Sequence, residues 1–278
     1  MTWKSYEEVY GSKHTVVGDV RVRQNVSSSG LKPRNILVYL PPNYEFESRD
    51  YPVLYMHDGQ NIFDDVTSYA GEWGVDESAE GLATRGLPCI IVGIPNGGEA
   101  RLDEYGPWQD ERLKQHSAAG EGGRALEYLA FLLGNVKPLV DSSFRTSRLR
   151  NQTGISGSSM GGLVSLWAAL EARETFGFCA ALSSSFWLGG KLEEFVAARV
   201  SKDLRMYQDV GAKESNVKAV QKSYLASNRK IRDLLKAQDC DLVYLEDANG
   251  LHNEADWRRR FPAVLEWFLD PTVRPALK

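Results

Sequence analysis

The sequence predicts an α/β fold with a mostly parallel central sheet, an antiparallel hairpin at its N-terminal edge and helices on both faces. Short, continuous apolar runs are typical of parallel strands that are buried on both faces. Stretches with helical periodicity separate these runs, and strand–helix–strand alternation implies right-handed crossovers within one sheet. The runs that we expect to be strands cover residues 52–56, 87–94, 152–156, 178–182, 204–210 and 242–245.

The first part of the chain alternates apolar and polar residues, as half-buried antiparallel strands do. Residues 14–25 carry Val17, Val20 and Val22 among polar neighbours, and residues 34–40 form a second β-rich run that ends before two prolines. These two runs predict the edge hairpin.

Four stretches have the periodicity of helices. The last begins after Asn253, a residue type that caps helices well, and the others cover 124–140, 160–176 and 214–237. Residues 96–123 break the pattern because they are rich in glycine and polar side chains. We expect an irregular loop there, which either is a solvated surface loop or shapes a substrate cleft.

Length and composition fit a single globular domain over residues 1–278. The chain is 42% hydrophobic and 25% charged, proportions that exclude a disordered or collagen-like protein. A net charge of -4 leaves no basic excess for nucleic acid. The longest nearly unbroken apolar run, residues 87–95, is far shorter than the roughly 20 residues of a membrane helix. We therefore expect neither nucleic acid nor a membrane as a partner.

Cys89, Cys179 and Cys240 lie in or beside apolar runs, and we expect reduced thiols in or near the core. No two of them have the spacing of metal ligands, and we expect no metal. Residues 1–8 are polar and acidic, unlike a signal peptide. The expected location is cytoplasmic, or secreted if a leader preceded this chain and was removed.

The most informative motif is Gly-x-Ser-x-Gly at 157–161, which centres on Ser159 in one register only. A nucleophilic serine has to stand at a tight strand-to-helix turn that exposes its hydroxyl. Glycines two residues before and after it let the chain segments approach closely. A predicted strand precedes the motif and a predicted helix follows it from Met160. This order predicts a nucleophile elbow, whose alternative is a glycine-rich turn without chemistry.

In such an architecture the order along the chain is nucleophile, acid, histidine. The histidines are His14, His57, His116 and His252, of which only His252 lies after Ser159. It stands in a predicted loop after a strand, and we predict that it is the catalytic base.

The acid should follow the strand that precedes the histidine's own strand. Glu214 is the first choice because it follows the expected strand 204–210, and its carboxylate should hydrogen-bond Nδ1 of His252. Asp209 is second because it lies within the strand, and Asp247, on the histidine's loop, is third. The alternative role for Glu214 is a first-turn carboxylate that the helix dipole favours.

The oxyanion that forms at a substrate carbonyl needs backbone donors. The amide of Met160, at the start of a helix, is the first. The second should come from the loop after an early strand, where Gly59 allows a close turn and the Gln60 amide follows. A rival interpretation of this loop is a metal site, but its candidate ligands lack suitable spacing: His57, Asp58, Asp64 and Asp65.

With these motifs, the sequence resembles the putative-esterase branch of the α/β-hydrolases, which includes esterase D-type, enterochelin esterase-like, feruloyl and acetylxylan esterases. The resemblance covers most of the chain and rests on a combination of segments. They are VYLPP (38–42), YPVLYMHDGQN (51–61), GEWGVD (71–76), VGIPNG (92–97), DEYGPW (103–108), GSSMGG (157–162) and GLHNEADW (250–257).

The resemblance implies one α/β-hydrolase domain and ester hydrolysis without a cofactor. In such proteins the acid falls in a Gly-Thr-x-Asp/Glu segment after the penultimate strand. Residues 211–214 match this slot, with Ala212 in place of threonine, which favours Glu214 over Asp209. Substrates in the family range from formyl thioesters to sugar esters and siderophore trilactones, and its relatives include mycolyl transferases.

We predict a serine esterase that acts through an acyl-enzyme on a small acyl, phenolic or sugar ester. This small-molecule ester substrate is the one partner that we expect. One alternative is an acyltransferase with the same triad. The other is a non-catalytic binding protein, which a complete triad disfavours. Trp73, Tyr105, Trp108 and Trp187 either line an aromatic substrate cleft or are packing residues. Arg101 either contacts an anionic substrate or is a solvated surface residue.

Overall fold

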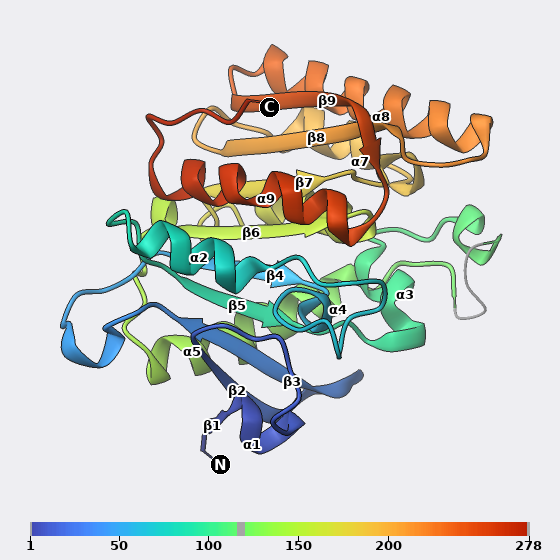
Figure 1. Cartoon of the computed structure of the whole chain (residues 1–278). Coiled ribbons are helices and arrows are strands. Elements are labelled where there is room, and N and C mark those ends of the chain that lie inside the picture. The colour runs from blue at the N-terminus through green and yellow to red at the C-terminus, as the bar shows by residue number, and fades with distance from the viewer. Residues whose placement is uncertain (1, 116–119, 277–278) are drawn as a thin grey trace. The chain divides into compact units, whose positions relative to one another are not determined.

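The computed structural model describes residues 2–115 and 120–276 (Figure 1). The chain divides into two compact units, which are described in turn. The first comprises residues 2–96, Ala130–Thr153 and Asn253–Pro275, and the second comprises residues 97–115, 120–129, Gly154–His252 and Ala276. His116, one of the four histidines, lies outside the described residues. The single domain expected over residues 1–278 stays a prediction.

The first unit contains a mixed sheet with the strand order β1-β2-β3-β5-β4. β2 and β3 form the antiparallel hairpin that the sequence predicts, although β2 begins only at Asp19, after Val17. β1, which the sequence does not predict, pairs with β2 and occupies the edge. The strands are β1 (Lys4–Ser5), β2 (Asp19–Ser28), β3 (Leu31–Leu40), β4 (Val53–His57) and β5 (Ile90–Ile94).

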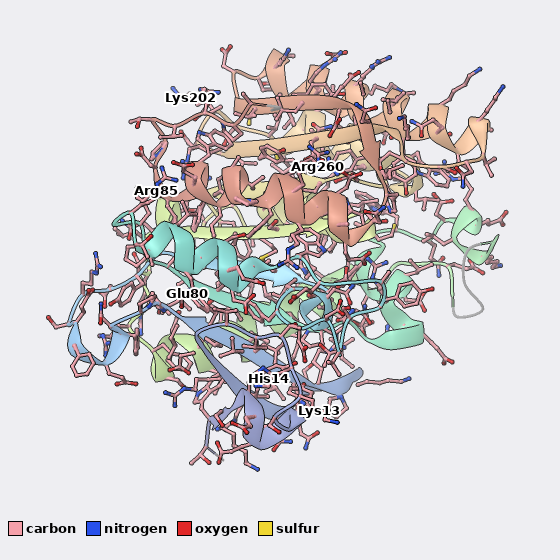
Figure 2. All side chains as sticks on the ribbon, in the orientation of Figure 1. Lys13, His14, Glu80, Arg85, Lys202 and Arg260 are labelled. Atoms are coloured by element: carbon pink, nitrogen blue, oxygen red, sulfur yellow. The ribbon has the colours of Figure 1, made fainter. Side chains whose placement is uncertain are left out.

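Helices cover both faces of this sheet: in Figure 1, α2 lies in front of β4 and β5, and α5 lies behind the sheet. The Tyr39 hydroxyl on β3 donates a hydrogen bond to Glu80 of α2 at 2.9 Å, which ties the helix to the sheet. Figure 2 labels Glu80 among the side chains. α2 also packs against α9, whose expected cap, Asn253, accepts a hydrogen bond from the Asp256 N–H. The helices are α1 (Tyr6–Tyr10), α2 (Val75–Ala83), α5 (Lys137–Ser143) and α9 (Glu254–Leu269).

The second unit contains a parallel sheet with the order β6-β7-β8-β9. β6 and β7 are buried along their whole length, as the continuous apolar runs predict. The strands are β6 (Thr153–Ser158), β7 (Phe178–Leu182), β8 (Arg205–Lys213) and β9 (Asp241–Leu251).

Three helices of the second unit form a layer over this sheet: α6 packs on β7, α8 packs on β8, and α7 contacts both helices. They are α6 (Met160–Glu171), α7 (Leu192–Arg199) and α8 (Lys218–Ala237). α8, with 20 residues, is largely polar outside its buried stripe. Within the described ranges, no helix combines the length and apolar character needed to cross a membrane.

The described part of 96–123 is more ordered than the sequence predicts. It contains α3 (Arg101–Tyr105), and the Asp103 carboxylate accepts a hydrogen bond from the Gly122 N–H at 2.8 Å. A Cβ on Gly106 would lie 2.9 Å from the Cα of Gly122. The glycines therefore let the segment fold back on itself, which corrects the expectation of an irregular loop.

The helix expected over residues 124–140 is divided into α4 (Ala125–Phe131), a π-helical turn (Leu132–Val136) and α5. Pro138 lies in the first turn of α5. Because proline has no N–H to donate four residues back, it costs less at a helix start than within a helix.

β9 continues well beyond its expected end at residue 245, so the predicted loop before His252 is strand. β8 and β9 stay paired because Gly211 faces Gly250: a Cβ on Gly211 would lie 2.3 Å from the Gly250 carbonyl oxygen. α8 begins at Lys218 and not at Glu214 as expected. Glu214 therefore lies in the loop after β8, free of the helix.

Candidate active site

Ser159 stands at the turn between β6 and α6, as the motif predicts. Its backbone has φ 57° and ψ −123°, a combination that residues other than glycine rarely adopt. The turn brings Gly157 against Gly161, so that a Cβ on Gly157 would lie 2.8 Å from the Gly161 carbonyl carbon. The segment has the geometry of a nucleophile elbow and depends on glycine at position 157.

α6 begins immediately after this serine. The Leu163 N–H donates a hydrogen bond to the Ser159 carbonyl at 3.2 Å. The N–H groups of a first helical turn have no acceptor within the helix, and the helix dipole adds partial positive charge there. Met160 is the first residue of that turn, which agrees with its predicted role as an oxyanion donor.

The carboxylate of Glu214 contacts the imidazole of His252, with Oε2 2.7 Å from Nδ1. The Glu214 side chain is 0% exposed and the His252 side chain 24% exposed. The second carboxylate oxygen, Oε1, accepts a hydrogen bond from the Gly211 N–H, which fixes the carboxylate group. The hydrogen bond expected between these side chains is therefore present, and their catalytic roles stay predictions.

The strand register places this pair. β8 and β9 are parallel neighbours, and Lys213 at the end of β8 pairs with Leu251 at the end of β9. Glu214 and His252 are the next residues along the two strands. Both side chains therefore start from the same carboxyl edge of the sheet, where α/β proteins usually build their sites.

The two other acid candidates have different partners. Asp209 is 0% exposed within β8, where its carboxylate accepts hydrogen bonds from the Ser183 N–H at 3.0 Å and the Tyr207 hydroxyl at 2.8 Å. Asp247 lies within β9, not in a loop, and accepts a hydrogen bond from the Asn249 N–H at 2.9 Å. The geometry favours Glu214 over both, as expected.

Two hydroxyl groups near Ser159 are not predicted by the sequence analysis. Ser185 Oγ lies 3.1 Å from Ser159 Oγ, and the Tyr224 hydroxyl lies 2.9 Å from Ser185 Oγ. The Tyr224 ring also lies against the His252 ring, with 5.1 Å between centroids. Sequence signals existed for both: Ser185 closely follows the strand β7, and Tyr224 shares a buried stripe of α8 with Ile231 and Leu235.

A model of the family described as "Putative esterase" matches residues 27–268 of the chain. The chain belongs to the putative-esterase family. The protein YbbA of Bacillus subtilis (strain 168), described as uncharacterized, is 27% identical to it over 240 residues, which cover 84% of this chain and 92% of YbbA. Membership of this family makes the chain a serine-type carboxylic-ester hydrolase.

Solved structures share the fold of this esterase. An IroE-like serine hydrolase from Shewanella oneidensis matches with a TM-score of 0.71 and 22% identity, covering 90% of this chain and 80% of that chain. A ferulic acid esterase matches with a TM-score of 0.67 and 17% identity, covering 90% of this chain and 98% of that chain. The predicted α/β-hydrolase fold is confirmed.

Gln60, the second predicted oxyanion donor, belongs to the first unit of the esterase. It lies in a short turn after β4, where Asp58 has a φ of 55°. Gly59 is pressed against β5, since a Cβ there would lie 2.5 Å from the Gly93 carbonyl carbon. The Gln60 side chain accepts a hydrogen bond from the Asn96 N–H at 3.2 Å. These contacts fix the turn against β5. The role of the Gln60 amide as an oxyanion donor stays a prediction.

The candidate substrate-binding residues divide into two groups. Trp73 (4% exposed) packs against Trp257 and Phe261, and Tyr105 (0% exposed) packs against Tyr128. For Trp73 and Tyr105, packing in the core explains why a large aromatic side chain stands there.

The remaining candidates are half-buried members of the second unit. Trp108 meets Phe195 edge-on, Trp187 meets Tyr224 edge-on, and the Arg101 guanidinium lies over the Tyr105 ring at 5.0 Å. Substrate contact by these three residues stays a prediction.

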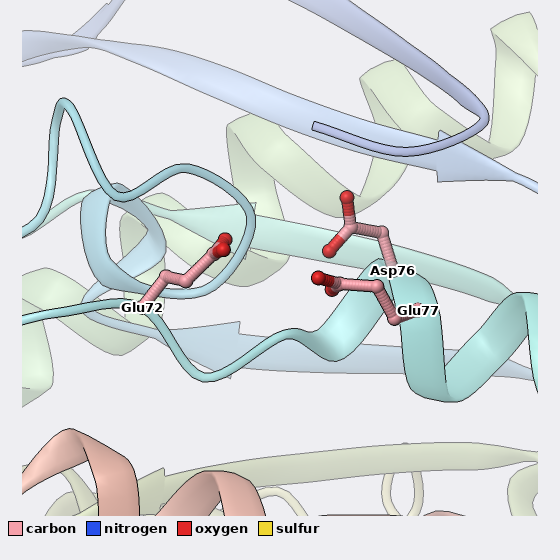
Figure 3. Close-up of side chains that lie close together, drawn as sticks. All are labelled: Glu72, Asp76 and Glu77. Carbon is pink, nitrogen blue, oxygen red and sulfur yellow. The ribbon is translucent and has the colours of Figure 1, made fainter. Parts of the chain in front are cut away.

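Three carboxylates of the first unit lie together (Figure 3): Glu72, Asp76 and Glu77 have oxygens within 4.8 Å of one another. Burial, together with the neighbouring Glu77, holds the pKa of Asp76 well above its usual range. A proton held between Asp76 and Glu77 would supply a partner for a buried oxygen on each. Arg258 contacts Glu72 at 3.4 Å and Glu77 at 2.9 Å. Such a proton and Arg258 would offset two of the three negative charges of the cluster, and the expectation of no metal stays a prediction.

Proposed function

We propose that this esterase cleaves its substrate through an acyl-enzyme on Ser159, with His252 as the general base and Glu214 as the acid that orients it. The observation that carries the proposal is the 2.7 Å contact between Glu214 and His252 Nδ1. A carboxylate at Nδ1 holds the imidazole in the tautomer whose Nε2 can accept the serine proton. The strained turn at Ser159 supports its role as the nucleophile.

The reaction follows from these roles. Ser159 Oγ forms a bond to the ester carbonyl carbon while its proton moves to His252 Nε2. The alcohol then leaves with that proton, and the acyl group remains on the serine. A water molecule gives a proton to His252 and attacks the acyl-enzyme, which releases the acid and restores Ser159. The negative oxygen of both tetrahedral intermediates is assigned to the amide of Met160. The amide of Gln60 stays the second donor that the sequence predicts.

The proposed substrate is a small acyl, phenolic or sugar ester. Two observations support an ester of a phenolic acid. One is the structural likeness to a ferulic acid esterase, and the other is the pair of half-buried indoles in the second unit, Trp108 and Trp187. An aromatic acyl group would stack on such rings. Transfer of the acyl group to an alcohol instead of water is the second candidate function, because the same triad serves both acceptors.

The test combines one variant with a substrate panel. Purified protein and Ser159→Ala are assayed with 4-nitrophenyl, feruloyl and acetyl-sugar esters, and with a fluorophosphonate probe. We expect hydrolysis of at least one ester, labelling of Ser159, and loss of both in Ser159→Ala. Labelling at Ser156 or Ser158 would contradict the assignment of the nucleophile. Faster acyl transfer to an added alcohol than to water would favour the transferase.

A further inference from the structure

A line of hydroxyl groups runs from the interior of the second unit to the nucleophile. The Tyr224 hydroxyl lies 2.9 Å from Ser185 Oγ, which lies 3.1 Å from Ser159 Oγ. Ser185 is 1% exposed and Tyr224 is 6% exposed. Buried hydroxyls that meet in this way are held in defined orientations, because water does not compete for them.

The loop that carries Ser185 is anchored at three successive residues. The Ser183 N–H donates to the Asp209 carboxylate at 3.0 Å, and the Ser184 carbonyl accepts from the Asn228 amide at 2.8 Å. The Ser185 N–H donates to the Ser159 carbonyl at 3.0 Å. These contacts fix the hydroxyl of Ser185 beside that of Ser159, and they give the buried Asp209 a role outside the triad.

The direction of the hydrogen bonds follows from the partners of the phenol. Burial raises the pKa of Tyr224, so the phenol keeps its proton. Ser185 Oγ lies within hydrogen-bond distance of the phenol, at 2.9 Å, and a serine hydroxyl can accept that proton. When Ser185 Oγ accepts from Tyr224, its own proton points to Ser159 Oγ.

We propose that Tyr224 and Ser185 form a hydrogen-bond chain that donates to Ser159 Oγ and so directs the nucleophile's own proton to His252. The opposite direction, with Ser159 donating to Ser185, would withhold that proton from the base. A donor at Oγ also stabilises the negative charge that this oxygen carries when it leaves the acyl-enzyme. Ser185 is then a catalytic residue, and Tyr224 is a positioning residue that acts through it. The proposal rests on Ser159 being the nucleophile.

The test compares Ser185→Ala, Tyr224→Phe and the double variant in the full chain, with a 4-nitrophenyl ester and a fluorophosphonate probe. Tyr224→Phe keeps the ring against His252 and removes only the hydroxyl. Each single variant should lower kcat by about ten- to a hundredfold with little change in KM, and slow labelling of Ser159 in parallel. Because the two residues act in series, the double variant should lose no more than Ser185→Ala alone.

Tyr244→Phe is the matched control, because the Tyr244 hydroxyl donates to Glu246 at 2.7 Å on β9 and has no part in the chain. It should lose a similar hydrogen bond and keep its kcat, and circular dichroism should show all variants folded. A kcat close to the parent's in either single variant, or losses that multiply in the double variant, would overturn the chain. Activity that persists in Ser159→Ala would instead overturn the proposed function itself.

Discussion

Ser159 is the residue on which the site is built, and its backbone is held where serine is rarely found. A non-glycine residue at a φ of 57° with ψ near −123° costs on the order of 1–3 kcal/mol, which the surrounding structure has to offset. Hydrogen bonds on both sides do so: the Ser159 N–H donates to the Leu182 carbonyl at 3.0 Å, and its carbonyl accepts from Ser185 and Leu163. The strain fits the proposed role of Ser159 as the nucleophile.

Substitution of Glu214 and of Asp209 should separate the proposed triad acid from a buried structural carboxylate. Glu214→Gln should lower kcat by as much as roughly 10,000-fold, because the amide cannot support the charged imidazole. Asp209→Asn should keep most of the turnover, since an amide oxygen can still accept from the Ser183 N–H, and lower mainly the thermal stability. Steady-state kinetics and melting curves of both variants check this. Loss of activity in Asp209→Asn alone would mean that the acid is wrongly assigned.

The Gln60 side chain should matter little to catalysis, because the predicted donor is its backbone amide. Gln60→Ala should lower kcat by less than about tenfold, whereas loss of an oxyanion donor costs about 100- to 1,000-fold in other enzymes. Removing the side chain does break its contact with the Asn96 N–H, so some loosening of the turn is expected. A loss of kcat as large as that of Glu214→Gln would show that the side chain itself takes part.

At the scale of elements, the ends of β8 and β9 bring Glu214 and His252 together. The two strands remain paired to their last residues because Gly211 and Gly250 can touch. A bulkier residue at either position would separate the strand ends, and with them Glu214 and His252.

The elbow between β6 and α6 also depends on a close glycine contact, here at Gly157. Gly157→Ala would place a methyl group 2.8 Å from the Gly161 backbone, so it should destabilise the protein by about 1–3 kcal/mol and reduce activity. Gly81→Ala in α2 is the control, because a Cβ there meets nothing within 4 Å and alanine favours a helix. Urea unfolding and ester hydrolysis measure both effects. Equal stability of the two variants would refute the close contact at the elbow.

At the scale of the whole molecule, the buried Asp76 should make stability depend on pH. Its folded-state pKa lies above the unfolded value, so its contribution is fully present below the usual carboxyl range and is lost as pH rises. Asp76→Asn stays neutral at every pH and can still accept from the Val17 N–H. It should stabilise the protein at neutral pH by about 1–3 kcal/mol, and by more at about pH 8 than at about pH 5.

Urea unfolding of Asp76→Asn at the two pH values measures this gain. Asp50→Asn, at an exposed carboxylate, is the control and should show no gain that grows with pH. A gain for Asp76→Asn that is the same at both pH values would contradict the shifted titration.

Much of the fold could be predicted from local patterns. Continuous apolar runs identified the parallel strands because a strand buried on both faces needs apolar side chains throughout. The ends of elements were less predictable: β9 continues past residue 245 through a contact between two glycines that are far apart in the sequence. The structure within 96–123 escaped prediction for a similar reason, since it depends on Gly106 meeting Gly122.

The sequence by itself determined the candidates for the nucleophile and the base and the expected order of the triad, because a tight turn needs glycines at set positions and only one histidine follows the serine. The tertiary structure alone placed Glu214, and not Asp209, against His252, since that contact depends on where each strand ends and on which groups already hold each carboxylate. It alone revealed Ser185 and Tyr224. Ser185 lies 26 residues after Ser159, and Tyr224 lies 39 residues after Ser185. Only the packing of α8 on the sheet and the anchoring of one loop bring their hydroxyls to Ser159.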